Sequence, residues 1–289
     1  MRSLCTASVT YSGLDVLLLA ILVILVWTPL VLPLQESVGK DGGSERVVTL
    51  RRYGTAYGGF YYPENLDYLS ERSIVYCVGA GEDISHDLEL GHQLGGNVYI
   101  FDPTPRAITH AEYIKALLDG REAQRPSPNF GGGDRDYLDK IVSTQMEAKR
   151  VHFYDYGLFT EDKMMKFHFP SVKEHVSMSL LADYPGRGDD FTIVEVKKLS
   201  TIMRELGHDR IDLLKLDIEG CECEVLDQML EEQIFPTYLG VDFDSLNTDR
   251  EKSMRTINKL QKSGYVLMHQ DGPDMSFMHV EGSAESVSP

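Results

Sequence analysis

A glycine-rich turn follows the first apolar run that is typical of a buried strand. The run Ile74–Val78 leads into Gly79, Ala80 and Gly81, and a segment with helical character comes next. Glycine lets the backbone turn tightly and approach a ligand closely, as in the first strand-turn-helix unit of nucleotide-binding α/β folds. The three residues of this turn are therefore candidates for contact with a cofactor.

Two carboxylates, Glu82 and Asp83, stand at the start of the following helix. A dinucleotide-binding turn has a third glycine where this chain has Ile84, and it binds a phosphate at the helix N-terminus. Carboxylates at that place repel a pyrophosphate and suit a ligand with a sulfonium centre, such as S-adenosylmethionine (SAM). The alternative is that both acids only complement the helix dipole, a stabilisation of about 0.3–1 kcal/mol.

An acidic residue also ends the next predicted strand. Asp102 follows Asn97–Phe101 directly, 21 residues after Gly81, and precedes Pro103. This spacing is typical of the acid that binds ribose hydroxyls in Rossmann-like folds, so we place Asp102 and Pro103 at the cofactor. The alternative is that Asp102 caps the helix that follows.

A third pair of carboxylates follows a predicted strand later in the chain. Asp217 comes directly after the strand Asp212–Leu216, and Glu219 lies in the next turn. Ligands of open α/β sheets bind at this end of the strands. The pair could orient a hydroxyl, accept its proton or hold a divalent cation, and whether a metal is needed stays open. The alternative is that both acids only cap and open a helix.

Seven short apolar runs alternate with helical patterns, which predicts an α/β fold. The last two runs are joined by only five residues, too few for a parallel crossover, so they should form an antiparallel hairpin. The predicted strands are Ile74–Val78, Asn97–Phe101, Val151–Tyr156, Asp212–Leu216, Tyr238–Phe243, Tyr265–His269 and Met275–Val280.

Three motifs together resemble the FkbM-type SAM-dependent methyltransferases: VGAGED, YIFDPTP and IDLLKLDIEGCECEVL. The resemblance spans roughly residues 50–281. It implies a class I methyltransferase (Rossmann-like) fold, a mostly parallel seven-stranded sheet with a terminal antiparallel hairpin. It also implies SAM as the cofactor, bound by Gly79, Gly81 and Asp102, with Tyr156 and Gly157 near the adenine and Asp217 and Glu219 at the reaction centre. Two positions depart from the family pattern: many members have an acid at Cys77 and a glycine at Asp83.

The resemblance leads us to expect a methyltransferase that moves a methyl group from SAM to a hydroxyl of a glycan, a lipid or a small metabolite. The alternative is a membrane-anchored scaffold that keeps the fold without catalysis. A nicotinamide-dependent oxidoreductase is disfavoured by Ile84 and the two acids before it. The aromatic run Tyr53–Pro63 could close over the ligands as a lid, or it could be an ordinary packed loop.

The charge of the chain excludes one class of partner. The 289 residues include 28 Lys and Arg against 45 Asp and Glu, a formal net charge of −17. This charge repels phosphate backbones, so we expect no nucleic-acid partner. Four cysteines are too few for a disulfide framework.

The apolar run Val16–Leu34 predicts a transmembrane signal anchor, because a helix of that length spans the roughly 30 Å hydrocarbon core. A cleaved signal peptide is the alternative. The predicted organisation is a tail (1–15), the anchor (16–34), a linker (35–46), a methyltransferase domain (47–281) and a disordered tail (282–289). We expect a single-pass membrane protein. The basic residues flanking the run favour a cytosolic domain, and a lumenal one stays open.

Overall fold

The computed structural model describes residues 48–127, 130–171, 178–180 and 186–280, and two short strands before them. Those strands, β1 (Gly39–Asp41) and β2 (Ser44–Arg46), pair antiparallel in a first compact unit, residues 1–48, and all other elements belong to a second unit, residues 49–289. The predicted anchor Val16–Leu34 lies outside the described residues. Within the described part of the chain, no helix is both long and apolar enough to cross a membrane.

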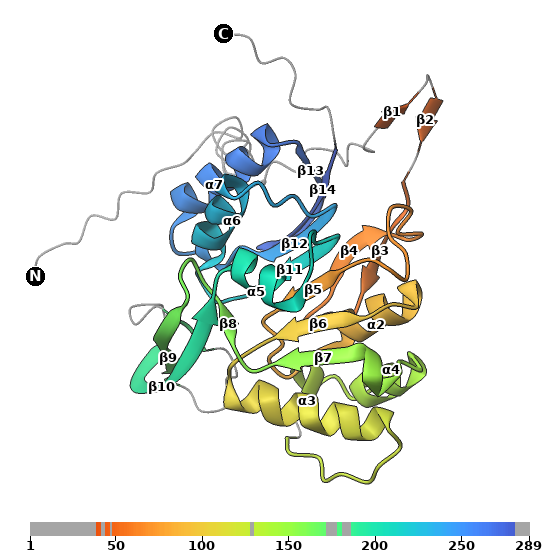
Figure 1. Cartoon of the computed structure of the whole chain (residues 1–289), viewed down its shortest axis with the longest axis vertical. Coiled ribbons are helices and arrows are strands. Elements are labelled where there is room, and N and C mark those ends of the chain that lie inside the picture. The colour runs from red at the N-terminus through yellow and green to blue at the C-terminus, as the bar shows by residue number, and fades with distance from the viewer. Residues whose placement is uncertain are drawn as a thin grey trace, which may run out of the picture. The chain divides into compact units, whose positions relative to one another are not determined.

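A seven-stranded sheet forms the centre of the second unit (Figure 1). Its strand order is β13-β14-β12-β11-β5-β6-β7, and β14 alone runs against its neighbours. The sequence-based prediction of a mostly parallel sheet with a terminal antiparallel hairpin is confirmed. The strands are β5 (Val75–Val78), β6 (Val98–Phe101), β7 (Val151–Tyr154), β11 (Leu213–Leu216), β12 (Tyr238–Asp242), β13 (Tyr265–Asp271) and β14 (Asp274–His279).

Both faces of this sheet are covered, which explains why its central strands are continuous apolar runs. Every residue of β5 and β11 is buried. One face packs against α5, α6 and α7, and the other against α2, α3, α4 and an N-terminal hairpin. The helices are α2 (Ser85–Leu94), α3 (Pro105–Leu118), α4 (Tyr137–Ser143), α5 (Leu199–Leu206), α6 (Glu222–Glu231) and α7 (Arg250–Lys262), with short 3₁₀ turns η1 (Phe130–Gly133), η2 (Ala148–Arg150) and η3 (Asp244–Leu246).

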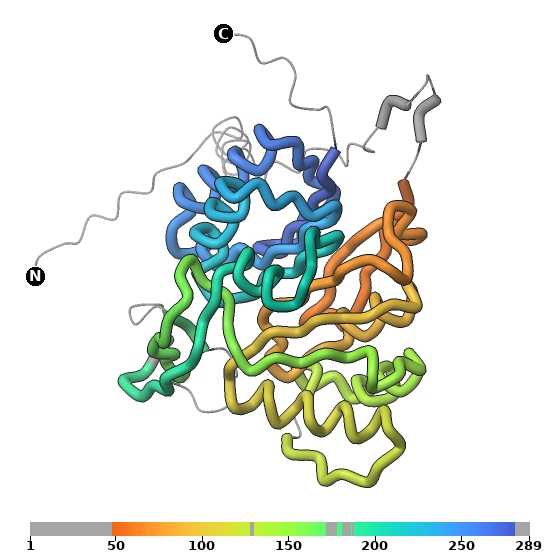
Figure 2. Tube along the Cα trace, viewed as in Figure 1, coloured from red at the N-terminus to blue at the C-terminus, as the bar shows by residue number. Residues whose placement is uncertain are grey.

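The N-terminal hairpin consists of β3 (Leu50–Tyr53) and β4 (Phe60–Pro63), which pair antiparallel. It lies beside α2, as the course of the chain in Figure 2 shows. Tyr53 and Tyr62 are fully buried in the core on this face. The run that we had interpreted as a lid or a packed loop is therefore two strands that flank a short loop, residues 54–59.

A second sheet, not predicted from the sequence, follows the seven-stranded sheet's β7. Its order is β8 (Gly157–Leu158), β10 (Arg187–Lys197) and β9 (Lys163–Pro170), with β9 and β10 antiparallel. Phe167 is buried on the inner face, but Met164 and Ile193 on the outer face are 62% and 60% exposed. Because both faces carry apolar side chains, the alternation of apolar and polar residues that marks a half-buried strand is weak here.

The central position of Leu214 yields a test of this packing. Leu214 is fully buried in β11, so Leu214→Ala is expected to lower the free energy of unfolding by about 2–5 kcal/mol through lost burial and a cavity. Urea denaturation followed by circular dichroism measures the change. Met254→Ala is the matched control, since Met254 is 39% exposed. Equal losses in the two variants would contradict the assignment of Leu214 to the core.

Candidate active site

One pocket, of about 350 Å³, lies at the carboxyl ends of β5, β6, β11 and β12. This is the edge of an open α/β sheet where ligands bind. The structure brings most of the predicted site residues together there. The predicted residues that line the pocket are Gly79, Ala80, Gly81, Glu82, Asp83, Asp102, Pro103, Gly157, Asp217 and Glu219.

Tyr156 is the one predicted residue that does not line this pocket. Its side chain is 92% buried in the core, where its ring lies 5.7 Å from that of Phe101 and 5.5 Å from that of Tyr154. The next two residues, Gly157 and Leu158, do line the pocket. Gly157 and Leu158, and not Tyr156, are therefore the residues of this segment that are placed for the predicted contact with the cofactor.

The glycine turn after β5 touches the turn after β11. Gly79 has φ +82°, and a Cβ atom on it would lie 1.7 Å from the carbonyl oxygen of Asp217. The main chains are also joined by a 3.1 Å hydrogen bond from Asp217 N to Val78 O. Only glycine fits position 79, because every other side chain would force the two turns apart.

Asp102 fastens the glycine turn to the end of β6. One carboxylate oxygen accepts hydrogen bonds from Ala80 N and Gly81 N, both 2.9 Å. The other accepts from Thr104 N at 2.8 Å and from Thr104 Oγ1 at 2.6 Å. A carboxylate offers about four acceptor positions, so Asp102 is saturated by the protein here. Its role as a ribose ligand stays a prediction.

Glu82 and Asp83 also have partners within the protein. Arg106 on α3 donates two hydrogen bonds to Glu82, from Nε to Oε1 at 3.0 Å and from Nη2 to Oε2 at 2.7 Å. Asp83 accepts a hydrogen bond from Thr55 Oγ1, and others from Ser85 N at 2.9 Å and Ser85 Oγ at 2.6 Å. Glu82 is thus neutralised by a cation of the protein, and Asp83 is satisfied by neutral donors, so neither acid needs a cationic ligand as its partner. That they contact the cofactor stays a prediction.

Lys215 is a buried cation beneath the pocket that the sequence analysis left without a role. Its side chain is 3% exposed, and Nζ donates to Gly79 O and lies 3.5 Å from Asp217 Oδ2. Burial lowers the pKa of Lys215, but the carboxylates of Asp217 and Asp87 outweigh burial and the net shift is upward. The sequence does contain a signal for this role, because Lys215 is the one charged residue in the otherwise apolar strand β11.

The turn after Asp217 has an unusual backbone. Glu219 adopts the left-handed conformation, with φ +55°, which is rare for a residue other than glycine. Glu222, fully buried, accepts from Ile218 N at 3.2 Å and Gly220 N at 2.9 Å. Ser179 Oγ donates to Glu219 O at 2.7 Å. These contacts fix the turn, and Glu219 lines the pocket.

Three aspartates converge at the acidic end of the pocket. Asp217, Asp242 and Asp244 each offer a carboxylate oxygen, and these oxygens lie within 4.8 Å of one another. Oxygen ligands of this kind could hold a hard divalent cation. Burial raises the pKa of Asp242 far above its ordinary value, and the charges of Asp217 and Asp244 raise it further. Asp242, the last residue of β12, and Asp244, two residues further on, were not predicted from the sequence.

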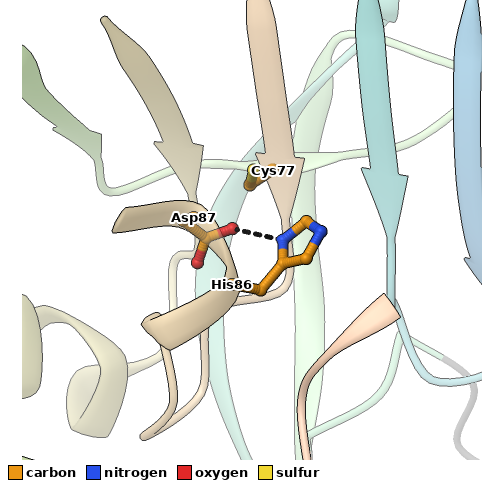
Figure 3. A group of neighbouring side chains, drawn as sticks. All are labelled: Cys77, His86 and Asp87. Carbon is orange, nitrogen blue, oxygen red and sulfur yellow. Dashed lines mark hydrogen bonds and ion pairs between the residues drawn. The ribbon is translucent and has the colours of Figure 1, made fainter. Parts of the chain in front are cut away.

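A second cluster, Cys77, His86 and Asp87, is buried beside the glycine turn (Figure 3). His86 Nδ1 lies 3.4 Å from Asp87 Oδ1, and burial raises the pKa of the Cys77 thiol, so the thiol stays neutral. Many members of the family have an acid at position 77, where this chain has Cys77. The structure instead places the carboxylate of Asp87, from α2, against Cys77.

Histidine is another possible general base, but no described histidine lines the pocket. The ring of His269 packs against Tyr61, with centroids 3.9 Å apart, and does not line the pocket. His175 lies outside the described residues. Asp217, which is 33% exposed and lines the pocket, is the better-placed base.

Comparison with known proteins agrees with this geometry. The model of the methyltransferase FkbM domain matches residues 76–267. The chain belongs to this family. The resemblance predicted from the motifs is confirmed, and the FkbM protein described here is a methyltransferase by family. No curated protein matches the chain.

Two solved structures match the chain at low sequence identity and with low TM-scores. An rRNA methylase from Streptococcus thermophilus is 10% identical, with a TM-score of 0.36, and the match covers 74% of this chain and 89% of that one. A putative transferase from Pyrococcus horikoshii is 8% identical, with a TM-score of 0.32, and the match covers 80% and 70% of the two chains. We therefore interpret the FkbM site from the family and from its own geometry.

The pairing of Glu82 with Arg106 can be tested through stability. Arg106→Ala leaves a carboxylate that is 5% exposed without its partner, so we expect a loss of about 1–3 kcal/mol in the free energy of unfolding. Arg121→Ala is the control, because its pair with Asp119 is exposed and should contribute less than about 1 kcal/mol. Urea denaturation at low salt measures both. An unchanged free energy of unfolding in Arg106→Ala would mean that water solvates Glu82 in place of Arg106.

The raised pKa of Asp242 predicts a pH dependence of stability. The unfolded chain releases this proton near the ordinary aspartate pKa of about 3.9, whereas the folded protein keeps it. The folded state then binds more protons, so this group makes stability fall as pH rises above that value. Asp242→Asn should flatten the slope between about pH 5 and about pH 8. The exposed Asp189→Asn should keep the wild-type slope, and an unchanged slope in Asp242→Asn would show an ionised Asp242.

Proposed function

We propose that this FkbM methyltransferase uses SAM to methylate a hydroxyl oxygen of a glycan, a lipid or a small metabolite. The observation that supports this proposal best is that the turns after three strands line one pocket. The glycine turn, the turn after β6 and the acidic turn after β11 all line the same 350 Å³ cavity. Such a cavity falls within the usual size range of ligand pockets, about 300–1,000 Å³.

The lining of the pocket combines polar and apolar groups, which fits a ligand with a polar and an apolar part. The polar groups include the main chain of Gly79–Gly81 and the carboxylates near it. Leu158, Phe167 and Leu180 are apolar residues of the lining and suit an adenine ring. In this proposal Gly81 would lie against the ribose and methionine portions, Asp102 would hold the glycine turn in position for them, and Gly157 would let the base approach the main chain closely.

Asp217 is the residue we assign to proton transfer. When bound, SAM supplies a methyl group on a positively charged sulfur. As the acceptor oxygen bonds to the methyl carbon and the carbon–sulfur bond breaks, Asp217 takes the hydroxyl proton. Lys215 beneath it holds the carboxylate in place through Oδ2. Positioning of the two reactants would supply much of the remaining rate enhancement.

Binding of S-adenosylhomocysteine (SAH) to the full chain, measured by calorimetry in a mild detergent, tests the cofactor. We expect micromolar affinity for the wild type and a loss of at least about tenfold in Asp102→Ala, because the glycine turn loses its acceptors. Asp119→Ala, on an exposed residue, is the control and should bind as the wild type does. A folded wild-type chain that binds neither SAM nor SAH would favour the scaffold alternative.

A second pair of variants separates cofactor binding from catalysis. Asp217→Asn should keep SAH affinity within about threefold but lower kcat by about 100-fold or more, the usual contribution of a general base. Transfer of radiolabelled methyl groups measures the rate, and the exposed Asp209→Asn is the control. Full activity in Asp217→Asn would assign proton transfer to another group. The membrane anchor at residues 16–34 and its orientation stay predictions.

A further inference from the structure

The β3–β4 hairpin lies outside the family match and yet forms part of the pocket wall. The match begins at residue 76, whereas the hairpin spans residues 50–63. Its loop contributes Tyr57 and Gly58 to the lining of the pocket. The pocket is therefore enclosed by the family domain together with an element that precedes it.

Thr55 holds this loop in one conformation. The side chain is buried, its Oγ1 donates to Asp83, and it accepts from Tyr57 N at 3.1 Å and Gly58 N at 3.2 Å. Thr55 N donates in turn to Ser85 Oγ at 2.9 Å. Asp83, one of the two departures from the family pattern, thus has a structural role: it ties the hairpin to the start of α2.

Tyr57 itself is held on one side and open on the other. A Cβ atom on Gly132 would lie 2.5 Å from Cγ of Tyr57, so the ring rests against the main chain of η1. The side chain is nevertheless 58% exposed. The hydroxyl of Tyr57 lies near the carboxylates of Asp217 and Glu219, and it is protonated at neutral pH because a tyrosine pKa is ordinarily about 10.

The charges around Tyr57 favour an uncharged ligand. Among the described residues that line the pocket, Lys215 is the single basic one, and it is buried and committed to Gly79 and Asp217. An anionic acceptor would therefore find no uncommitted cation among the described residues of the lining. Carboxylates such as Asp217 and Glu219 accept hydrogen bonds from hydroxyl groups. An exposed aromatic ring offers a flat surface to the C–H face of a saturated ring.

We propose that Tyr57 is a specificity-determining residue: the β3–β4 hairpin holds its ring at the pocket as a platform for an uncharged, hydroxyl-bearing ring in the acceptor. The proposal rests on the proposed function, since it assumes methyl transfer at Asp217. It adds the hairpin to the acceptor site and excludes phosphorylated or carboxylated acceptors.

The test uses the full chain in mild detergent, radiolabelled SAM, and a set of uncharged ring alcohols, namely methyl pyranosides and myo-inositol. Tyr57→Ala should raise KM for the ring alcohol that is methylated by roughly tenfold while kcat stays within about threefold, because the platform acts on binding. Tyr57→Phe keeps the ring and should stay within about threefold of the wild-type KM. Tyr68→Ala, on a residue that is 63% exposed and outside the pocket lining, is the matched control.

SAH affinity measured on the same samples separates the two proposals. If the wild type binds no SAH, the proposed function fails. If it binds SAH and Tyr57→Ala leaves KM unchanged, the role of Tyr57 is overturned. If the wild type binds SAH but methylates only glucuronic acid, sugar phosphates or amines, or none of the ring alcohols, the uncharged-ring assignment is overturned.

Discussion

The contact between the turns after β5 and β11 is the constraint on which the pocket depends. Gly79 approaches the carbonyl of Asp217 so closely that no side chain fits between them. Lys215 joins the same two turns from below through Gly79 O and Asp217. A buried cation is costly unless it is paired, so Lys215 needs both partners in place. The glycine turn and the acidic turn are thereby fixed relative to each other before any ligand enters.

The sequence predicted the central sheet well because each of its strands is an apolar run that ends in a turn signal. The order of elements and the short link before Met275 were enough to predict the reversed last strand. The sheet of β9 and β10 was missed because Met164 and Ile193 put apolar side chains on its exposed face. The hairpin was missed because glycines between Tyr53 and Phe60 suggested a loop.

The sequence predicted where the site lies, but not the partners of the side chains within it. Strand ends and motif spacing located Gly79, Asp102 and Asp217 at one edge, where the pocket lies. Spacing says nothing about which donors satisfy a side chain, so the partners of Glu82 and Asp83 were not foreseen. The acid that stands against Cys77 belongs to Asp87, on the next helix. Lys215 lies within the motif IDLLKLDIEGCECEVL, but neither Lys215 nor Asp242 was assigned a role, because each acts through three-dimensional neighbours.

The hydrogen bond between Thr55 and Asp83 connects the β3–β4 loop to the turn that follows β5, and both segments line the pocket. Asp83 belongs to the turn beside the predicted cofactor site, and Thr55 sets the main chain of Tyr57. A ligand that shifts the turn would shift the loop as well, and a ligand that rests on the loop would act back on the turn, since coupling between two sites is reciprocal. Two ligands that bind at the turn and at the loop would therefore change each other's affinity by the same factor, whichever of them arrives first.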